Sequence, residues 1–130
     1  MIYSITEIEA RYAETDKMGV IYHGNYATWF EVARLDYISK LGFSYADMEK
    51  QGIISPVTDL NVNYKKSIFY PEKGELATTG STELICIKED TFKPIRLDRY
   101  FPDWHEAYSK VQTLNNEGKT VEIMDGIDSL

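Results

Sequence analysis

Asp16 stands seven residues before a His23-Gly24-Asn25 turn, and a helical pattern begins at that turn. A carboxylate can serve as a nucleophile or as a general base, and the first turn of a helix has backbone N–H groups without intrahelical partners. Such N–H groups can bind the negative charge that gathers on a carbonyl oxygen under attack. Gly19 allows the chain to turn tightly between Asp16 and the His23-Gly24-Asn25 turn. The spacing therefore predicts an acyl-transfer site.

The same residue types also have a purely structural interpretation. Asp and Gly are common in turns, and His23 and Asn25 can act as capping residues of the helix that follows. The spacing alone does not decide between chemistry and turn formation, so both hypotheses stay open at this point.

A longer stretch around Asp16 resembles the signature of a known family. Residues 12–26 have the sequence YAETDKMGVIYHGNY, and residues 29–34 have the sequence WFEVAR. Together they are similar to the pattern T-D-x-x-G-V-x-Y-H-x-N-Y with F-E-x-A-R downstream, which is typical of the 4-hydroxybenzoyl-CoA thioesterase family of hotdog-fold acyl-CoA thioesterases. The segment from Ser55 to Pro71 also resembles the second strand of that family and the turn after it.

This resemblance implies a fold and a reaction. The fold is α+β, a hotdog fold in which one long central helix is wrapped by a curved antiparallel sheet. The reaction is hydrolysis of an acyl-CoA to a carboxylic acid and free coenzyme A. Asp16 matches the catalytic acid as nucleophile or general base, and the backbone N–H at His23 matches the donor that polarises the thioester carbonyl. Tyr22, Gly24 and Asn25 match the substrate-binding positions next to His23.

The resemblance also implies partners. The substrate is an acyl-CoA, and no metal or redox cofactor is expected, because coenzyme A enters only as part of the substrate. Family members place the site at a dimer interface, so we expect a homodimer that pairs again as a homotetramer. An exposed edge strand is a ready surface for such pairing.

Glu31 and Arg34 belong to the same motif and have two interpretations. Three residues apart on a helix, they can form an ion pair. Alternatively, Glu31 reaches the site and orients Asn25 or a water molecule, so Glu31 is included among the candidate substrate-binding residues.

The composition indicates one small acidic domain, residues 1–130. The chain is 43% hydrophobic and 13% aromatic, which suffices for a single core. A net charge of −7 argues against a nucleic-acid partner, because phosphate binding needs a basic patch. The two histidines, His23 and His105, are far apart, so no metal site is expected. With no membrane-spanning apolar run and no signal peptide, we expect a cytoplasmic protein.

Apolar periodicity predicts the elements that position the site. Alternation over residues 7–12 predicts a half-buried strand. A stripe at three- and four-residue steps predicts a helix from Asn25 to Leu41, ended by Gly42. The other predicted elements are a short helix over 43–51, strands over 57–70 and 75–87, and a terminal helix over 101–114.

The chain departs from the family pattern between Lys73 and Gly74. At this point family members carry further residues that form two central strands of roughly ten residues each. A sheet without them would leave a large apolar face of the helix uncovered. We therefore expect that a segment of the polypeptide is missing from the sequence between Lys73 and Gly74, and that these two residues are too far apart in space for a peptide bond.

Two other functions stay open. One is a catalytically idle hotdog protein that binds acyl-CoA or serves as a scaffold: Asp16 argues against it and the missing strands argue for it. The other is a thioesterase for acyl carrier protein, against which the acidic balance counts, because carrier proteins are themselves acidic. The length and shape of the acyl group cannot be read from the sequence.

Overall fold

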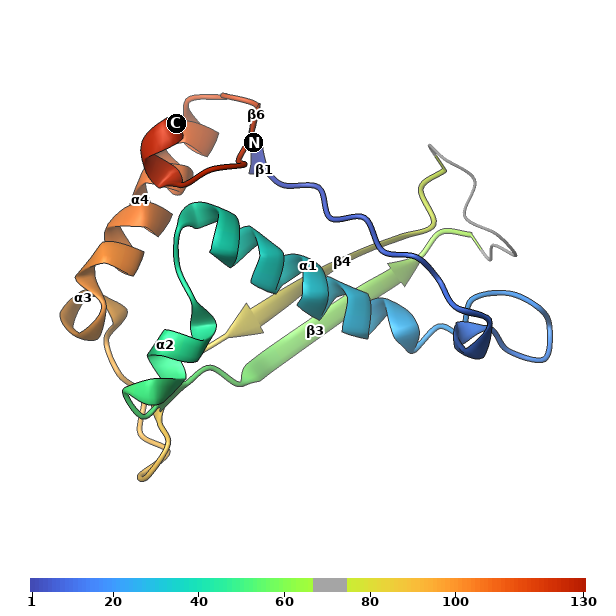
Figure 1. Ribbon diagram of the computed structural model, residues 1–130, viewed down its shortest axis with the longest axis horizontal. Helices are drawn as coiled ribbons and strands as arrows, with labels where there is room; N and C mark the ends of the chain where they lie inside the picture. The colour runs from blue at the N-terminus through green and yellow to red at the C-terminus, as the bar shows by residue number, and fades with distance from the viewer. Residues whose placement is uncertain (67–74) are drawn as a thin grey trace.

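The computed structural model describes residues 1–66 and 75–130, and a 17-residue helix, α1 (Asn25–Leu41), crosses its middle (Figure 1). The helix ends at Gly42, whose φ of 103° is a left-handed conformation that glycine adopts without a steric penalty. The predicted bounds of this helix are confirmed. Its N-terminal end, next to the Asp16 loop, is the end that positions the candidate site.

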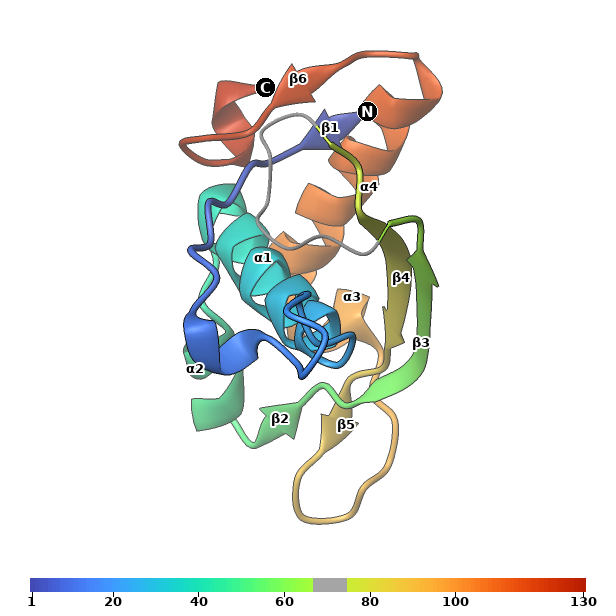
Figure 2. The same cartoon turned by 90° about the vertical axis from the view of Figure 1, so that its right-hand side faces the viewer.

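A pair of antiparallel strands lies along one side of α1 (Figure 2). It consists of β3 (Val57–Tyr64) and β4 (Thr78–Leu84), and the two strands pair Leu60 with Thr82 and Tyr64 with Thr78. The strand predicted over 57–70 thus ends at Tyr64 within the described residues. β3 runs toward the N-terminal end of α1, so its last residue lies near the candidate site.

Two further pairs of short strands complete the described structure. β1 (Ile2–Tyr3) pairs in parallel with β6 (Val121–Glu122), which brings the two ends of the chain side by side. β2 (Ile53–Ile54) pairs antiparallel with β5 (Ile87–Lys88), so the strand predicted over 75–87 is divided between β4 and β5. In residues 1–66 and 75–130 the strands therefore form three two-stranded sheets.

The strand predicted over residues 7–12 is wrong. A 3₁₀ turn at Tyr12–Glu14 occupies its end, and the residues before that turn have no regular structure. The residue just before this segment is fastened to α1, since Thr6 Oγ1 donates a hydrogen bond to Asp36 Oδ2 at 2.6 Å. A strand needs a neighbour for its backbone N–H and C=O groups, and the described part of the chain places none beside these residues.

Two of the remaining helices, α2 (Tyr45–Lys50) and α4 (Pro102–Asn116), agree with the predicted ones to within a few residues. The four-residue helix α3 (Leu97–Tyr100) has no predicted counterpart. Pro102 begins α4, a position at which the missing N–H of proline costs no hydrogen bond.

The buried core is concentrated at the C-terminal half of α1. One cluster joins Ile38, Met48 and Trp104 where α1, α2 and α4 meet, and a second joins Ile2, Leu41 and Ile123 near the chain ends. The N-terminal end of α1 is therefore held by other contacts, which are those of the candidate site.

Gly80 on β4 is a position without room for a side chain. A Cβ there would lie 2.5 Å from the Asn61 carbonyl oxygen and 2.5 Å from the Phe30 ring. We expect Gly80→Ala to lower the free energy of unfolding, measured by urea denaturation, by about 1–3 kcal/mol, as overpacking does. Ser81→Ala, at the exposed neighbouring position, should change it by less than about 0.5 kcal/mol. Equal stability of the two variants would contradict the close approach of β4 to α1.

The expected break between Lys73 and Gly74 lies outside the described residues. In the part of the chain that the structure describes, no helix has the length and apolar character needed to cross a membrane. Within the same residues, no three His, Cys, Asp or Glu side chains gather where they could hold a metal ion.

Candidate active site

The Asp16 loop is a tight turn closed by its own hydrogen bonds. The Asp16 N–H donates to the Val20 carbonyl at 2.9 Å, and the Gly19 N–H donates to the Asp16 carbonyl at 3.0 Å. Gly19 has a φ of 76°, so the predicted need for glycine in this turn is confirmed. Asp16 Oδ1 accepts the Met18 N–H at 2.8 Å. Among the described residues Oδ2 has no partner, so one oxygen of this half-buried carboxylate is available.

Asp16 lines a surface hollow together with Tyr22 and Asn25. We call it the Asp16 hollow. The Asn25 Nδ2 donates to the Glu14 carbonyl at 2.7 Å, which fixes the side chain of the first residue of α1. The structure thus brings together three of the residues that the sequence indicated.

The backbone turns at His23 and Gly24 immediately before α1 begins. The Asn25 N–H donates to the Tyr22 carbonyl at 3.1 Å, whereas the N–H groups of His23 and Gly24 have no acceptor in the described part of the chain. They stand at the positive end of the helix dipole. Free N–H groups at such a place can stabilise an oxyanion without reorganisation.

Aromatic rings pack around this turn. A Cβ on Gly24 would lie 2.6 Å from Cε1 of Tyr22, so the ring takes the space that a side chain at Gly24 would need. The His23 ring lies 4.4 Å from the Tyr22 ring and 6.0 Å from the Tyr64 ring, between centroids. Tyr64 Oη donates to the His23 carbonyl at 3.0 Å. The end of β3 therefore fixes the backbone at His23.

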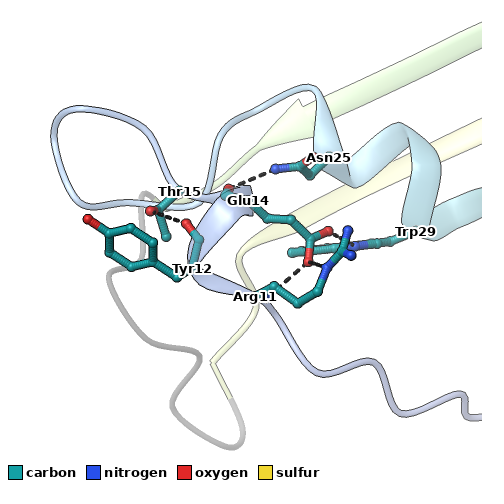
Figure 3. Close-up of polar contacts among 6 residues, drawn as sticks. All are labelled: Arg11, Tyr12, Glu14, Thr15, Asn25 and Trp29. Atoms are coloured by element: carbon teal, nitrogen blue, oxygen red, sulfur yellow. Dashed lines mark hydrogen bonds and ion pairs between the residues drawn. The ribbon is translucent and has the colours of Figure 1, made fainter.

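Glu14 connects the Asp16 loop to helix α1 (Figure 3). The sequence did not indicate a role for this residue. Its carbonyl accepts the Tyr22 N–H at 2.9 Å as well as the Asn25 side chain. One carboxylate oxygen accepts the Arg11 N–H at 2.9 Å and Arg11 Nε at 3.1 Å, and the other accepts Trp29 Nε1 at 3.0 Å. We call these contacts the Glu14 clamp. The Glu14 side chain is 12% exposed, whereas the Arg11 side chain is 77% exposed, so the Arg11 side of the clamp faces water.

The Glu14 clamp predicts a pH dependence. Hydrogen bonds, that of the Arg11 backbone N–H first, hold the pKa of the Glu14 carboxyl below its ordinary value of 4.5. A carboxyl with a lowered folded pKa stabilises the structure above its unfolded pKa, and this stabilisation is lost as the pH falls through the folded pKa. We therefore expect the Trp29 indole N–H resonance to be constant at neutral pH and to move below pH 4.5.

Trp104 supplies the control, because it lies in the core away from Glu14. Its indole resonance should stay constant while that of Trp29 moves. In Glu14→Gln the Trp29 resonance should already be displaced at neutral pH and should no longer respond to acid. If both indole resonances move together, the protein is unfolding as a whole, which would contradict a local clamp.

Glu31 lies apart from the Asp16 hollow. Its carboxylate pairs with the Arg34 guanidinium, and its side chain is 44% exposed. Six residues beyond Asn25, it stands about 9 Å further along the helix. The ion-pair interpretation is confirmed, and the substrate-binding role of Glu31 stays a prediction.

Comparison with known proteins identifies the family. A model of the thioesterase superfamily matches residues 18–79. YneP of Bacillus subtilis (strain 168), provisionally named an acyl-CoA thioesterase, is 42% identical over 137 residues, covering 86% of this chain and 99% of YneP. The chain belongs to the thioesterase superfamily. It is therefore an enzyme of the hydrolase class, and the resemblance found in the sequence is confirmed.

Solved structures confirm the α+β hotdog fold. The crystal structure of a DHNA-CoA thioesterase from Staphylococcus aureus is 82% identical, with a TM-score of 0.92, covering 95% of this chain and all of that chain. Slr0204 from Synechocystis, a 1,4-dihydroxy-2-naphthoyl-CoA thioesterase, is 14% identical, with a TM-score of 0.59 over 75% of this chain and 85% of its own. The second likeness concerns the fold alone.

Proposed function

We propose that this thioesterase hydrolyses an aromatic acyl-CoA of the DHNA-CoA type. The observation that carries the proposal is the 82% identity, over 95% of the chain, to the S. aureus DHNA-CoA thioesterase. The similarity to YneP supports the broader class, acyl-CoA hydrolysis. Coenzyme A takes part only within the substrate, and no other cofactor is needed for the chemistry described below.

Asp16 begins the reaction in this proposal. Its available oxygen either attacks the thioester carbon or removes a proton from a water molecule that does so. In both routes the C–S bond breaks and coenzyme A leaves as the thiolate. In the first route, water then hydrolyses the anhydride formed on Asp16. The support is the half-buried carboxylate that lines a hollow with one oxygen unpartnered among the described residues.

The His23 N–H binds the charge that develops on the thioester oxygen. This role is supported by the N–H having no acceptor in the described part of the chain and by its place before α1. Tyr22, Gly24 and Asn25 would contact the substrate, because Tyr22 and Asn25 line the Asp16 hollow and Gly24 lies against the Tyr22 ring. Glu31 would bind substrate only if it leaves its ion pair.

Assembly is part of the proposal. In the described part of the chain, β3 and β4 pair only with each other, so each has an unpaired outer edge. Val57 and Leu60 on β3 are each 47% exposed. Both features favour a homodimer, pairing again as a homotetramer, in which one subunit supplies Asp16 and the other helps to bind coenzyme A. Light scattering on the protein as it elutes from a size-exclusion column would measure the mass of the assembly.

Release of the free thiol, followed with a thiol reagent, tests the substrate class. We expect kcat/KM for DHNA-CoA to exceed that for benzoyl-CoA and decanoyl-CoA by about tenfold or more, since a shaped pocket discriminates by this order. Binding of DHNA-CoA without hydrolysis would favour a catalytically idle hotdog protein that binds acyl-CoA. Faster hydrolysis of the same acyl group on acyl carrier protein would favour a thioesterase that acts on acyl carrier protein.

The expected missing segment has support from YneP. The alignment with YneP is 137 residues long, but it includes only 86% of this 130-residue chain. YneP therefore carries residues in the matched region that have no counterpart in this sequence. We propose that the polypeptide continues between Lys73 and Gly74 through a segment of that kind. The intact mass of the purified protein should then be well above 15.0 kDa. A mass of 15.0 kDa would contradict the proposal.

A further inference from the structure

Two residues one helical turn apart on α1 hold the same partner. Asn25 begins the helix and Trp29 lies four positions later, so their side chains leave one face with about 5–6 Å between the Cβ atoms. The Asn25 amide donates to the Glu14 carbonyl at 2.7 Å, and the Trp29 indole donates to the Glu14 carboxylate at 3.0 Å (Figure 3). A single contact would let the helix pivot about it. Two contacts at this separation fix the direction of the helix as well as its distance from Glu14.

Glu14 also closes the base of the Asp16 loop. Its carbonyl oxygen accepts the Tyr22 N–H at 2.9 Å, so the chain that enters the loop is joined to the chain that leaves it. Asp16 follows Glu14 by two residues, which limits the separation of their Cα atoms to about 7 Å. His23 follows Tyr22 directly. Glu14 is therefore connected on one side to the carboxylate proposed to begin the reaction, and on the other to the N–H proposed to bind the oxyanion.

Both oxygens of the Glu14 carboxylate are needed for these contacts. One accepts the backbone N–H and the Nε of Arg11, and the other accepts Trp29 Nε1. Glutamine has the same size but offers one acceptor oxygen, with an NH₂ donor in place of the other. At this position it can keep the contacts on one side only, and on the other side a donor would face a donor. A hydrogen bond to a charged oxygen is also about twice as strong as a neutral one.

We propose that Glu14 is a positioning residue for thioester hydrolysis, which holds α1 so that the His23 N–H and the Asp16 carboxylate face the same thioester carbonyl. The inference rests on the function proposed above. Glu14 is not among the described residues that line the Asp16 hollow, so it acts through the groups that it holds. The alignment of those groups matters when the oxyanion forms and not when the substrate binds. Because a displacement of about 1 Å can slow catalysis a hundredfold, Glu14 should affect kcat and not KM.

Steady-state hydrolysis of DHNA-CoA by Glu14→Gln tests the inference. We expect kcat to fall about ten- to a hundredfold and KM to change by less than about twofold. The Kd of a thioether analogue of DHNA-CoA, measured by calorimetry, should also stay within about twofold of its value in the natural protein. Glu9→Gln is the matched control, because it makes the same change at an exposed residue earlier in the chain, and it should leave kcat unchanged.

Trp29→Phe tests the contact from the helix side, because it removes the indole N–H and keeps an aromatic ring. Together with Glu14→Gln and the double variant it forms a mutant cycle. The double variant should be no slower than the slower single variant, since the second change removes a contact that is already lost. Losses that multiply would overturn the inference. If Glu14→Gln fails to fold, folded Trp29→Phe should itself show a lowered kcat with an unchanged Kd for the analogue, and natural turnover in it would overturn the inference.

Asp16→Asn, assayed beside these variants, separates the inference from the function on which it rests. Loss of turnover in Asp16→Asn with natural turnover in Glu14→Gln would overturn the positioning role of Glu14 and leave the proposed function intact. Natural turnover in Asp16→Asn would overturn both. Weaker binding of the thioether analogue to Glu14→Gln, with kcat unchanged, would place Glu14 in substrate binding and overturn its positioning role.

Discussion

Asp16→Asn is expected to keep the fold and to lower kcat for thioester hydrolysis about a hundredfold or more. The amide can neither attack the carbonyl carbon nor accept a proton. Its oxygen can still accept the Met18 N–H that the carboxylate accepts, so the turn should survive. Steady-state kinetics with DHNA-CoA and circular dichroism of the same sample measure the two effects separately.

Asp59→Asn is the matched control, because Asp59 is an exposed carboxylate on β3. It removes one charge from a chain of the same length and should leave turnover unchanged. Turnover near that of the natural protein in Asp16→Asn would show that the carboxylate does not take part in the reaction.

The second large effect is expected at position 23. Proline removes the backbone N–H, so His23→Pro should lower kcat on the order of a hundred- to a thousandfold, the usual loss for one oxyanion donor. His23→Ala keeps the N–H and should lose less than about tenfold. The same hydrolysis assay on both variants makes the comparison.

The Trp29 indole resonance serves as the control for His23→Pro. If it keeps its position, the Glu14 clamp is intact and the loss of rate belongs to the N–H group. Should His23→Ala be as damaging as Asp16→Asn in a folded protein, the imidazole side chain itself takes part in catalysis.

Local signals explain which parts could be predicted. Helix α1 follows from an apolar stripe and a terminal glycine, and the Asp16 turn follows from Gly19, so neighbouring residues decide both. The alternation over residues 7–12 is equally clear, but a strand also needs a neighbouring strand. Periodicity does not report whether that neighbour exists.

Contacts between distant residues could not be predicted. Trp29 follows Glu14 by fifteen positions, and nothing in their spacing indicates that the indole donates to the carboxylate. The larger core cluster is assembled from three helices, so only the fold brings Ile38, Met48 and Trp104 together.

The hydrogen bond from Tyr64 to the His23 carbonyl acts on the next residue as well. That carbonyl and the Gly24 N–H belong to one planar trans peptide, so they point in opposite directions. By holding the oxygen, the Tyr64 hydroxyl also sets the direction of the Gly24 N–H at the start of α1. A small shift of the last residue of β3 would rotate this peptide plane, and the reactivity of a thioester at the helix end thus depends on where a strand stops.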